Sequence, residues 1–454
     1  MMCFSMGIGL VAVGCEEDDE GDESITPVDT GSDSESDTGT GAAAPIDPRC
    51  DATTRVCIIT GTLIDNEHWT ADYKWLLRGG VFVGDDTNRT VLTIDPGTTI
   101  YGESSTLGML VIRRNSQIIA IGTKEAPIVF TSANTPGTRA RGDWGGLIIN
   151  GRATINGCDE APCEAAGEGG TGNYGGDNDA DSSGVLKYVR VEFAGTQISP
   201  ENELNGIAFQ GVGAGTTVDY VQVHMNADDG IEFFGGTCSA KHLYLTGIGD
   251  DNLDWTDGWR GRVQYVVAQQ YPDAGDQGIE ADNNADNNTV TPVANPVISN
   301  VTLLGSGSDN SDIGMLLREG TRATIHNALV ANFGDACLDI DNYTVTEAFM
   351  GRVKINNSIF ACAKNFEEEG DEYVSETDTE PYMAATEVFT NGVGNRTVAP
   401  ASIATVLSGV TSTGAALTGG AAPEGIPFFD AVTYVGGVTA ADNWLAGWTT
   451  SAPN

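Results

Sequence analysis

Apolar and polar positions alternate in short segments that recur about every two dozen residues. Six segments align on a central residue followed by an aliphatic residue, and the successive gaps are 24, 22, 26, 36 and 23 residues: Gly206, Gly230, Asn252, Gly278, Gly314 and Cys337. The first and third positions after each centre are apolar, and the second is often acidic. Alternation with a period of two predicts a strand with one buried side. A repeat of this length predicts one coil of a parallel β-helix, whose aliphatic side chains stack into a continuous core.

The rest of the chain follows the same rhythm less regularly. A second apolar strand precedes most centres, for example VDYVQVHM from Val218 and KHLYLTG from Lys241. A Gly- and acid-rich insertion at 158–183 interrupts the repeat, and no extended helical periodicity occurs. We therefore predict an all-β fold, a single-stranded parallel β-helix with inserted loops. The expected segments are an N-terminal cap with the first strands at 51–95, the β-helix at 96–365, and C-terminal coils with a cap at 366–454.

The N-terminal segment predicts export and lipid anchoring. Residues 1–14 are apolar and too short to span a bilayer, which is typical of a signal peptide. The AVGC segment that ends at Cys15 resembles a bacterial lipobox, in which the Cys15 thiol takes the lipid, although no Lys or Arg precedes it. An ordinary buried strand or helix is the alternative. Residues 15–50 are predicted to be a disordered acidic tether, because 16–40 contain eleven acids and no Lys or Arg.

Charge excludes some partners. The chain has 454 residues, 64 acidic and 22 basic side chains, and a formal net charge of -42. Such a charge repels nucleic acid and anionic lipid, so we expect no nucleic-acid partner and membrane contact through the lipid anchor only. The four histidines have no short spacing, which argues against a histidine zinc site or a catalytic triad.

Cysteine spacing predicts an oxidising compartment. Close pairs at Cys50/Cys57 and Cys158/Cys163, and a pair one repeat apart at Cys337/Cys362, favour three disulfides with Cys238 left over. The connectivity is a hypothesis. Metal thiolates are the alternative, and the chain has no CxxC pair to support them.

The acidic positions of the repeat are the candidate functional site. Equivalent positions of a β-helix lie above one another, so the acids two positions before and two positions after each centre predict two carboxylate columns. Ca²⁺ accepts six to eight oxygen ligands with tolerant geometry and offsets their repulsion. The predicted ligands are Asp228, Asp229, Glu232, Asp250, Asp251, Asp254 and Glu280. The alternative is that the leading Asp of each repeat caps its turn, while the outward acids are solvated or paired with Arg260, Arg262, Arg318 or Arg322.

The same region allows an enzyme interpretation. A lyase needs a cation and a basic residue, and a hydrolase needs two or three carboxylates. The catalytic candidates are Asp228, Asp229, Asp250, Asp251, Asp254, Arg260 and Arg262. No GHG or RIK segment accompanies the double Asp, which argues against the polygalacturonase type of hydrolase. Trp259 is a candidate for stacking on a sugar ring, with packing as the equal alternative, whereas the register of Trp255 favours packing.

Several segments resemble a known family. LTIDPGTTIYG, IIAIGTKEAPIVFTS, GDWGGLIINGRA, DDGIEFFGG and DDNLDWTDGWRG are similar to secreted bacterial surface lipoproteins, including spirochaetal outer-membrane lipoproteins, with a pectate-lyase-like right-handed β-helix. The resemblance covers roughly 60–454 and implies a place at the outer membrane or cell surface. It implies no catalytic residue. The function we expect is a non-catalytic surface module that binds calcium or a glycan or has a structural role at the cell surface, and the alternative is a polysaccharide lyase or glycoside hydrolase using the acids at 228–254.

Overall fold

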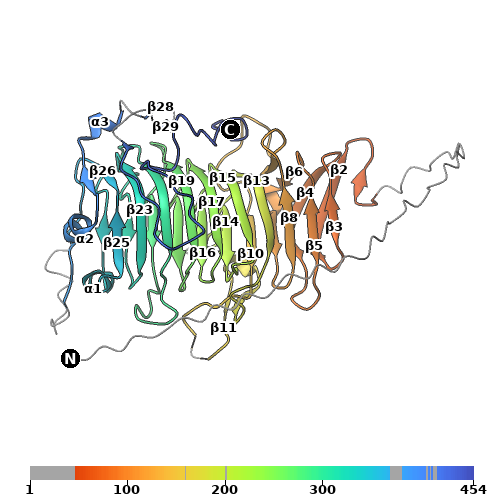
Figure 1. Ribbon diagram of the computed structural model, residues 1–454. Helices are drawn as coiled ribbons and strands as arrows, with labels where there is room; N and C mark the ends of the chain where they lie inside the picture. The colour runs from red at the N-terminus through yellow and green to blue at the C-terminus, as the bar shows by residue number, and fades with distance from the viewer. Residues whose placement is uncertain are drawn as a thin grey trace, which may run out of the picture. The chain divides into compact units, whose positions relative to one another are not determined.

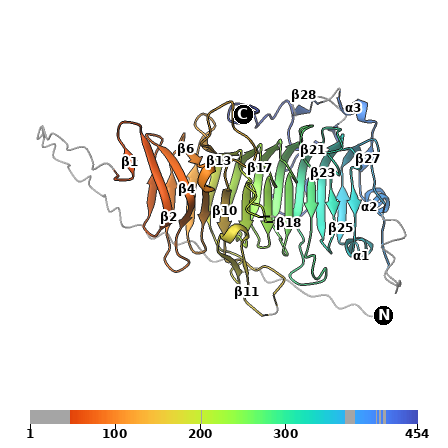
Figure 2. The same ribbon diagram turned by 180° about the vertical axis from the view of Figure 1, so that it is seen from behind.

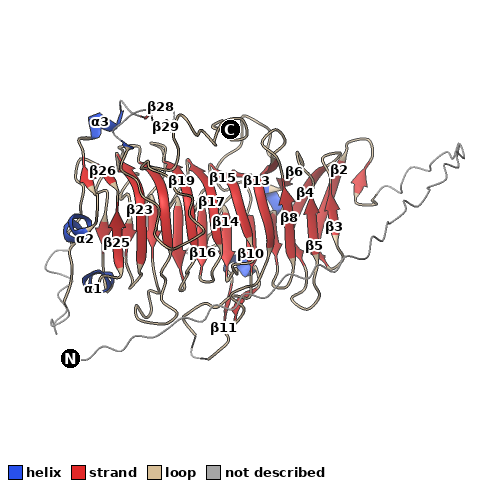
Figure 3. Cartoon of the chain, viewed as in Figure 1, coloured by secondary structure: helices blue, strands red, loops and turns tan. Residues whose placement is uncertain are grey.

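The chain folds into a long stack of parallel strands. The computed structural model describes residues 47–158, 160–199, 202–368, 381–404, 407–408, 411–412 and 417–454. In this part of the chain, a sheet of 25 strands is joined almost throughout by parallel pairings (Figures 1 and 3). The predicted right-handed parallel β-helix is confirmed. Within these described residues, no helix combines the length and the apolar character needed to cross a bilayer.

The strands form three parallel columns, which we name face A, face B and face C. Face A begins with the C-terminal halves of β2 (Val56–Leu63) and β4 (Lys74–Val83). It continues through β7 (Met109–Ile112), β10 (Gly146–Asn150), β14 (Ile207–Gln210), β16 (Ile231–Phe234), β18 (Leu253–Thr256), β20 (Ile279–Ala281), β22 (Leu316–Leu317) and β24 (Asp339–Ile340). Parallel pairing therefore begins at Val56, within the segment expected to hold the N-terminal cap and first strands.

Faces B and C share six long strands. These strands are β13 (Gly184–Glu192), β15 (Thr217–His224), β17 (Ser239–Thr246), β19 (Arg262–Gln269), β21 (Val297–Leu304) and β23 (Ala323–Ala331). Face B consists of the C-terminal halves of these strands, the starts of β2 and β4, and the short strands β6 (Thr99–Gly102), β9 (Ile128–Ser132), β26 (Ile359–Ala361) and β27 (Arg396–Thr397). Face C consists of the N-terminal halves of the long strands together with β3 (Glu67–Trp69), β5 (Val91–Ile94), β8 (Gln117–Ile121) and β25 (Val353–Asn356).

The register of face A confirms the repeat read from the sequence. Glu232 pairs with Asp254, Asp254 with Glu280, and Glu280 with Leu316, so these positions lie directly above one another. The apolar positions on either side of them point inward. Ile231, Phe233, Leu253 and Trp255 are fully buried, and the Phe209 and Phe233 rings stack at 5.1 Å. The stacked interior of successive coils is therefore the core of the protein.

The long strands bend where face C meets face B. Tyr188, Tyr220, His242 and Tyr265 occupy the bend of successive coils with positive φ, and their rings stack at 4.4, 4.1 and 4.7 Å. The chain at 417–454 runs back along the stack (Figure 2). Buried Trp444 and Trp448 pack on this aromatic row. Backbone atoms of this segment bond side chains far apart in the stack, including Gln222, Gln264 and Asn327. The segment thus ties several coils together.

The remaining elements lie at the ends and in the insertions. They are β1 (Cys50–Asp51), η1 (Ser104–Thr106), β11 (Cys163–Ala166), η2 (Glu168–Gly170), β12 (Asn173–Gly176), α1 (Thr344–Phe349), α2 (Ala385–Asn391), α3 (Pro400–Ala404), β28 (Leu407–Ser408) and β29 (Thr411–Ser412). The strands β11 and β12 form a hairpin within the insertion that the sequence indicated.

Three disulfides hold loops and coils together. They join Cys50 to Cys57, Cys158 to Cys163 and Cys337 to Cys362, the pairs expected from spacing. Cys238 is buried with a free thiol.

Candidate functional site

The predicted acid columns meet on the outer side of face A. One column consists of Glu232 on β16, Asp254 on β18 and Glu280 on β20. The other lies on the turns that precede these strands. Three groups of carboxylates have ligand atoms within 4.8 Å of one another: Asp228/Asp229/Asp250, Asp229/Glu232/Asp254 and Asp250/Asp251/Asp276. We call these seven acids the acid cluster. Six of the seven predicted ligands belong to it, and Glu280 does not.

The insertion explains why the first acids of the column are buried. Along the outer side of face A, Val111, Ile148 and Ala208 precede Glu232 in register. This apolar part of the column packs against Ile155 from the loop after β10, Tyr174 from the insertion and Leu204 from the loop after β13. The hairpin of the insertion lies beside this part of the stack (Figure 1). At the edge of this cover, the exposed fraction is only 8% for both Glu232 and Asp254. Acids that would be solvated on a bare sheet are therefore partly dehydrated here.

Two members of the acid cluster cap the next turn. Asp229 Oδ1 accepts the backbone N–H of Asp251 at 3.0 Å, and Asp251 Oδ1 accepts the N–H of Gln277 at 2.6 Å. Turn capping, the alternative to a metal site, is thus present. The capping residue is the second Asp of each Asp-Asp pair, not the leading Asp that we expected, and it caps the turn of the next coil. These bonds engage one oxygen of each carboxylate, which leaves the other free for a cation.

Burial and mutual repulsion raise the pKa of the acids. Burial, followed by the neighbouring Asp254, raises the pKa of Asp229 well above its usual value. Burial, followed by Glu232, does the same for the pKa of Asp254. Burial and Asp250 raise the pKa of Asp228 to about 7. Proximity of like charges in a site of low polarity is therefore costly unless protons or cations neutralise them.

Within the part of the chain that the structure describes, basic side chains form ion pairs with acids of the two columns only beyond the acid cluster. Arg318 Nη2 lies 2.6 Å from Glu280 Oε2, and its Nε lies 3.0 Å from Asp282 Oδ1. Lys364 lies 3.7 Å from Asp335 at the far end of the turn column. Among the described residues, no side-chain cation forms an ion pair with Asp229, Glu232 or Asp254. Moreover, Asp254 Oδ1 is buried and has no hydrogen-bond partner. An oxygen without a partner, beside two further carboxylates, fits a hard cation.

The structure corrects the basic and aromatic candidates. Arg260 pairs with Asp179 at 3.1 Å, in the insertion, and Arg262 is exposed at the start of β19 on face C. Neither belongs to the acid cluster, and the arginine beside it is Arg318. Trp259 is fully buried, with its ring stacked on Phe233 at 4.2 Å and its Nε1–H donated to Cys238 O. It is not available to a sugar ring. Trp255 is buried as expected. Cys15 lies outside the described residues.

Two neighbours of the acid cluster were missed in the sequence. Glu168 of the insertion is held near Glu203 and Asp257, and burial is the main cause that raises its pKa to about 7. Asn205 Nδ2 donates to Glu232 Oε2 at 2.6 Å. Asn205 stands one position before the centre Gly206, so the sequence already indicated that it lies in the turn beside the acids. The proximity of Glu168 to the acid cluster could not be predicted, because the insertion does not follow the spacing of the repeat.

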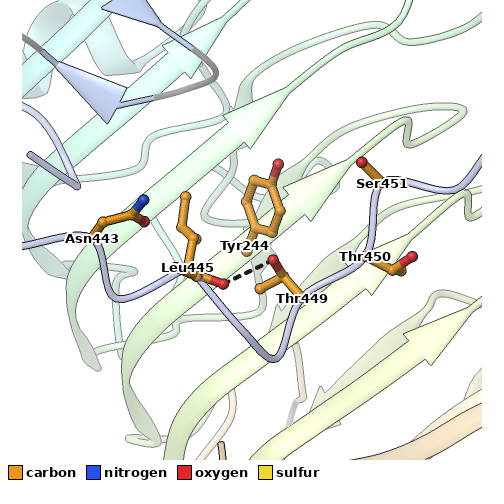
Figure 4. A pocket seen from close by; sticks show the side chains of 7 residues that line it. Tyr244, Asn443, Leu445, Thr449, Thr450 and Ser451 are labelled. Carbon is orange, nitrogen blue, oxygen red and sulfur yellow. Dashed lines mark hydrogen bonds between the residues drawn. The ribbon is translucent and has the colours of Figure 1, made fainter. Parts of the chain in front are cut away.

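A small pocket lies away from the acid cluster, beneath the returning C-terminal segment (Figure 4). Its volume is about 150 Å³, and it lies between Tyr244 and the segment from Asn443 to Ser451. Thr449 Oγ1 donates to Leu445 O within the wall. The lining contains no acidic or basic side chain.

Fold and site together define the class: a right-handed parallel β-helix that carries a buried carboxylate cluster on one face. The family model described as "Pectate-lyase like beta helix domain" matches residues 61–449, and the chain belongs to this family. A similar solved structure is the enzymatically active domain of tailspike protein 2 of bacteriophage CBA120, with a TM-score of 0.35 and 12% identity. The match covers 65% of this chain and 44% of that one, so the chain spans less than half the length of that structure. No curated protein matches the sequence.

Proposed function

We propose that the protein is a lipid-anchored cell-surface β-helix that binds Ca²⁺ between Asp229, Glu232 and Asp254. The observation that carries the proposal is the buried Asp254 Oδ1, which lacks a partner and lies beside two other carboxylates. Asn205, with its amide on Glu232, stands next to this group.

The energy of the acid cluster favours a bound cation. Two unit charges 4.8 Å apart repel by about 3.5 kcal/mol at an effective dielectric constant of 20. Each of the three carboxylates has two such neighbours. A divalent cation reverses the sign of this interaction, and Ca²⁺ suits it because carboxylate and amide oxygens are its usual ligands.

The surface location rests on the sequence and on the disulfides. Three disulfides are consistent with an exported protein. The lipobox-like Cys15 and the acidic segment after it support a tether to the outer membrane or cell surface. A glycan or another surface component is the partner that we propose for such a module. Incorporation of labelled palmitate that disappears in Cys15→Ser tests the anchor, and incorporation that persists in this variant excludes it.

Calcium titration of the full chain tests the binding function. Wild-type protein should release heat on Ca²⁺ addition and melt at a higher temperature, while Glu232→Gln should lose most of both effects. Asp309→Asn is the matched control, because it removes one charge from an exposed loop. Absence of binding by wild-type protein, or an equal loss in the control, would exclude the proposed site.

A polysaccharide lyase or glycoside hydrolase is the second candidate. The surroundings of two acids favour it: burial and neighbouring acids raise the pKa of Asp228 and of Glu168 to about 7, the range in which a carboxyl group acts as a general acid. Incubation with polyuronates and neutral glycans, with and without Ca²⁺, tests it through unsaturated or reducing ends. Product that is lost in Asp228→Asn supports an enzyme, and no product from any substrate favours the binding module.

A further inference from the structure

The turn side of the acid cluster contains a second set of three carboxylates that could hold a cation. Asp250, Asp251 and Asp276 have ligand atoms within 4.8 Å of one another. None of them belongs to the group of Asp229, Glu232 and Asp254. The third group consists of Asp228, Asp229 from the first set and Asp250 from the second set. The two sets are therefore adjacent.

An amide side chain stands at each end of this arrangement. One position before successive centres, the chain carries Asn205, Asp229, Asp251 and Gln277, and the strands that follow these residues are in register. The row of residues one position before the centres therefore reads amide, acid, acid, amide. Asn205 Oδ1 and Gln277 Oε1 are both buried without a hydrogen-bond partner, at residues that are 1% and 6% exposed.

Gln277 lies directly against the second set. Its backbone N–H donates to Asp251 Oδ1 at 2.6 Å, and its side chain lies beside the Asp276 carboxyl group. The unpartnered Oε1 belongs to this side chain. At the first set, Asn205 likewise has an unpartnered Oδ1, and its Nδ2 donates to Glu232. A buried amide oxygen without a donor has lost its hydration and has gained no bond in return.

The charge of the acid cluster exceeds what one ion neutralises. Its seven carboxylates carry up to seven negative charges, and Arg318 is occupied by Glu280 and Asp282. One divalent cation at the first set leaves Asp250, Asp251 and Asp276 facing one another.

We propose that the acid cluster holds two divalent cations, the second bound by Asp250, Asp251, Asp276 and Gln277 Oε1. This inference rests on the proposed calcium function and extends it from one ion to a pair. Asp229 and Asp250 lie between the two ions, because each belongs both to its own set and to the group that joins them.

Stoichiometry tests the proposal. Equilibrium dialysis of the full chain against ⁴⁵Ca²⁺ should give two ions per chain for the wild-type protein and for the Asp309→Asn control. Asp276→Asn and Gln277→Ala should each abolish the binding of the second ion, or weaken it at least tenfold, without affecting the first ion. Glu232→Gln should have the same effect on the first ion without affecting the second. Gln277→Ala keeps the backbone N–H that donates to Asp251 Oδ1, so this variant preserves the turn if Asp276→Asn fails to fold.

The outcomes separate the two proposals. One ion in wild-type protein, lost in Glu232→Gln and unaffected by both Asp276→Asn and Gln277→Ala, overturns the second site and leaves the first. Two ions that persist in both second-site variants overturn its assignment to these residues. No bound calcium at all overturns both proposals.

Discussion

Replacing Asp254 with Asn should change stability in opposite directions with and without calcium. Without calcium, Asp254 faces Asp229 and Glu232, and each pair of charges at 4.8 Å costs about 3.5 kcal/mol at an effective dielectric constant of 20. Protonation relieves part of this repulsion, because the pKa of each group is raised by burial and by its neighbours. The amide keeps the volume of the carboxyl group and removes the charge. We therefore expect the variant to be more stable than wild-type protein by about 1–3 kcal/mol in chelator.

With calcium, the order should invert. A ligand present at about 100 times its dissociation constant stabilises the folded state by about 2.7 kcal/mol, and the Asp254→Asn substitution removes a charged ligand from the site. Urea unfolding, followed by tryptophan fluorescence in EDTA and in excess Ca²⁺, measures both differences. The Asp309→Asn control should behave as wild-type protein in both buffers. If Asp254→Asn is destabilising in EDTA by as much as in Ca²⁺, Asp254 has a structural role and the reasoning from repulsion is refuted.

Further predictions concern pH, the disulfides and the C-terminal segment. Since the folded state raises the pKa of Asp228 to about 7, it holds an extra proton there between about pH 4 and 7, so calcium-free stability should fall as pH rises through this window, by up to about 1.4 kcal/mol per pH unit for each such carboxyl group. Urea midpoints in EDTA at pH 5 and pH 8 check the sign, and a higher midpoint at pH 8 contradicts it. Loss of the Cys337–Cys362 bridge, which spans 25 residues, should cost about 3 kcal/mol, as measured by unfolding of the double Ser variant. Trp448→Ala removes a buried ring from the aromatic row and should cost about 3–5 kcal/mol while leaving calcium stoichiometry unchanged. Loss of calcium in this variant would show that the row and the acid cluster are coupled.

The repeat was predictable because its spacing determines its register. Glu232, Asp254 and Glu280 are 22 and 26 residues apart in the sequence and pair directly in the sheet. Their apolar neighbours Ile231 and Leu253 are buried as the alternation indicated. Short cysteine spacings also gave the two local disulfides, since few other partners lie within reach.

Contacts between the stack and its loops were not predictable. Trp259 follows the acidic strand by only a few residues, yet the turn brings its ring onto Phe233 inside the core. The capping role of Asp229 depends on an amide one coil ahead, which a local reading of the turn does not include. The C-terminal segment 417–454 is held along the bends by side chains such as Gln222 and Asn327. Nothing in the sequence of their strands indicates that these side chains bind a distant segment.

The insertion and the acid cluster depend on each other. The outer column of face A changes from apolar to acidic between Ala208 and Glu232, which pair in register, and the cover formed by Tyr174 and Leu204 reaches Phe234 on the strand that carries Glu232. A cover that buries apolar side chains also excludes water from the first acids beyond them, so the gain from apolar burial brings a desolvation cost at Glu232 and Asp254. Arg318 offsets this cost for Glu280, one coil further along. Among the described residues, no basic side chain forms an ion pair with Glu232 or Asp254, and the cation that we propose would supply the missing positive charge beside the apolar cover.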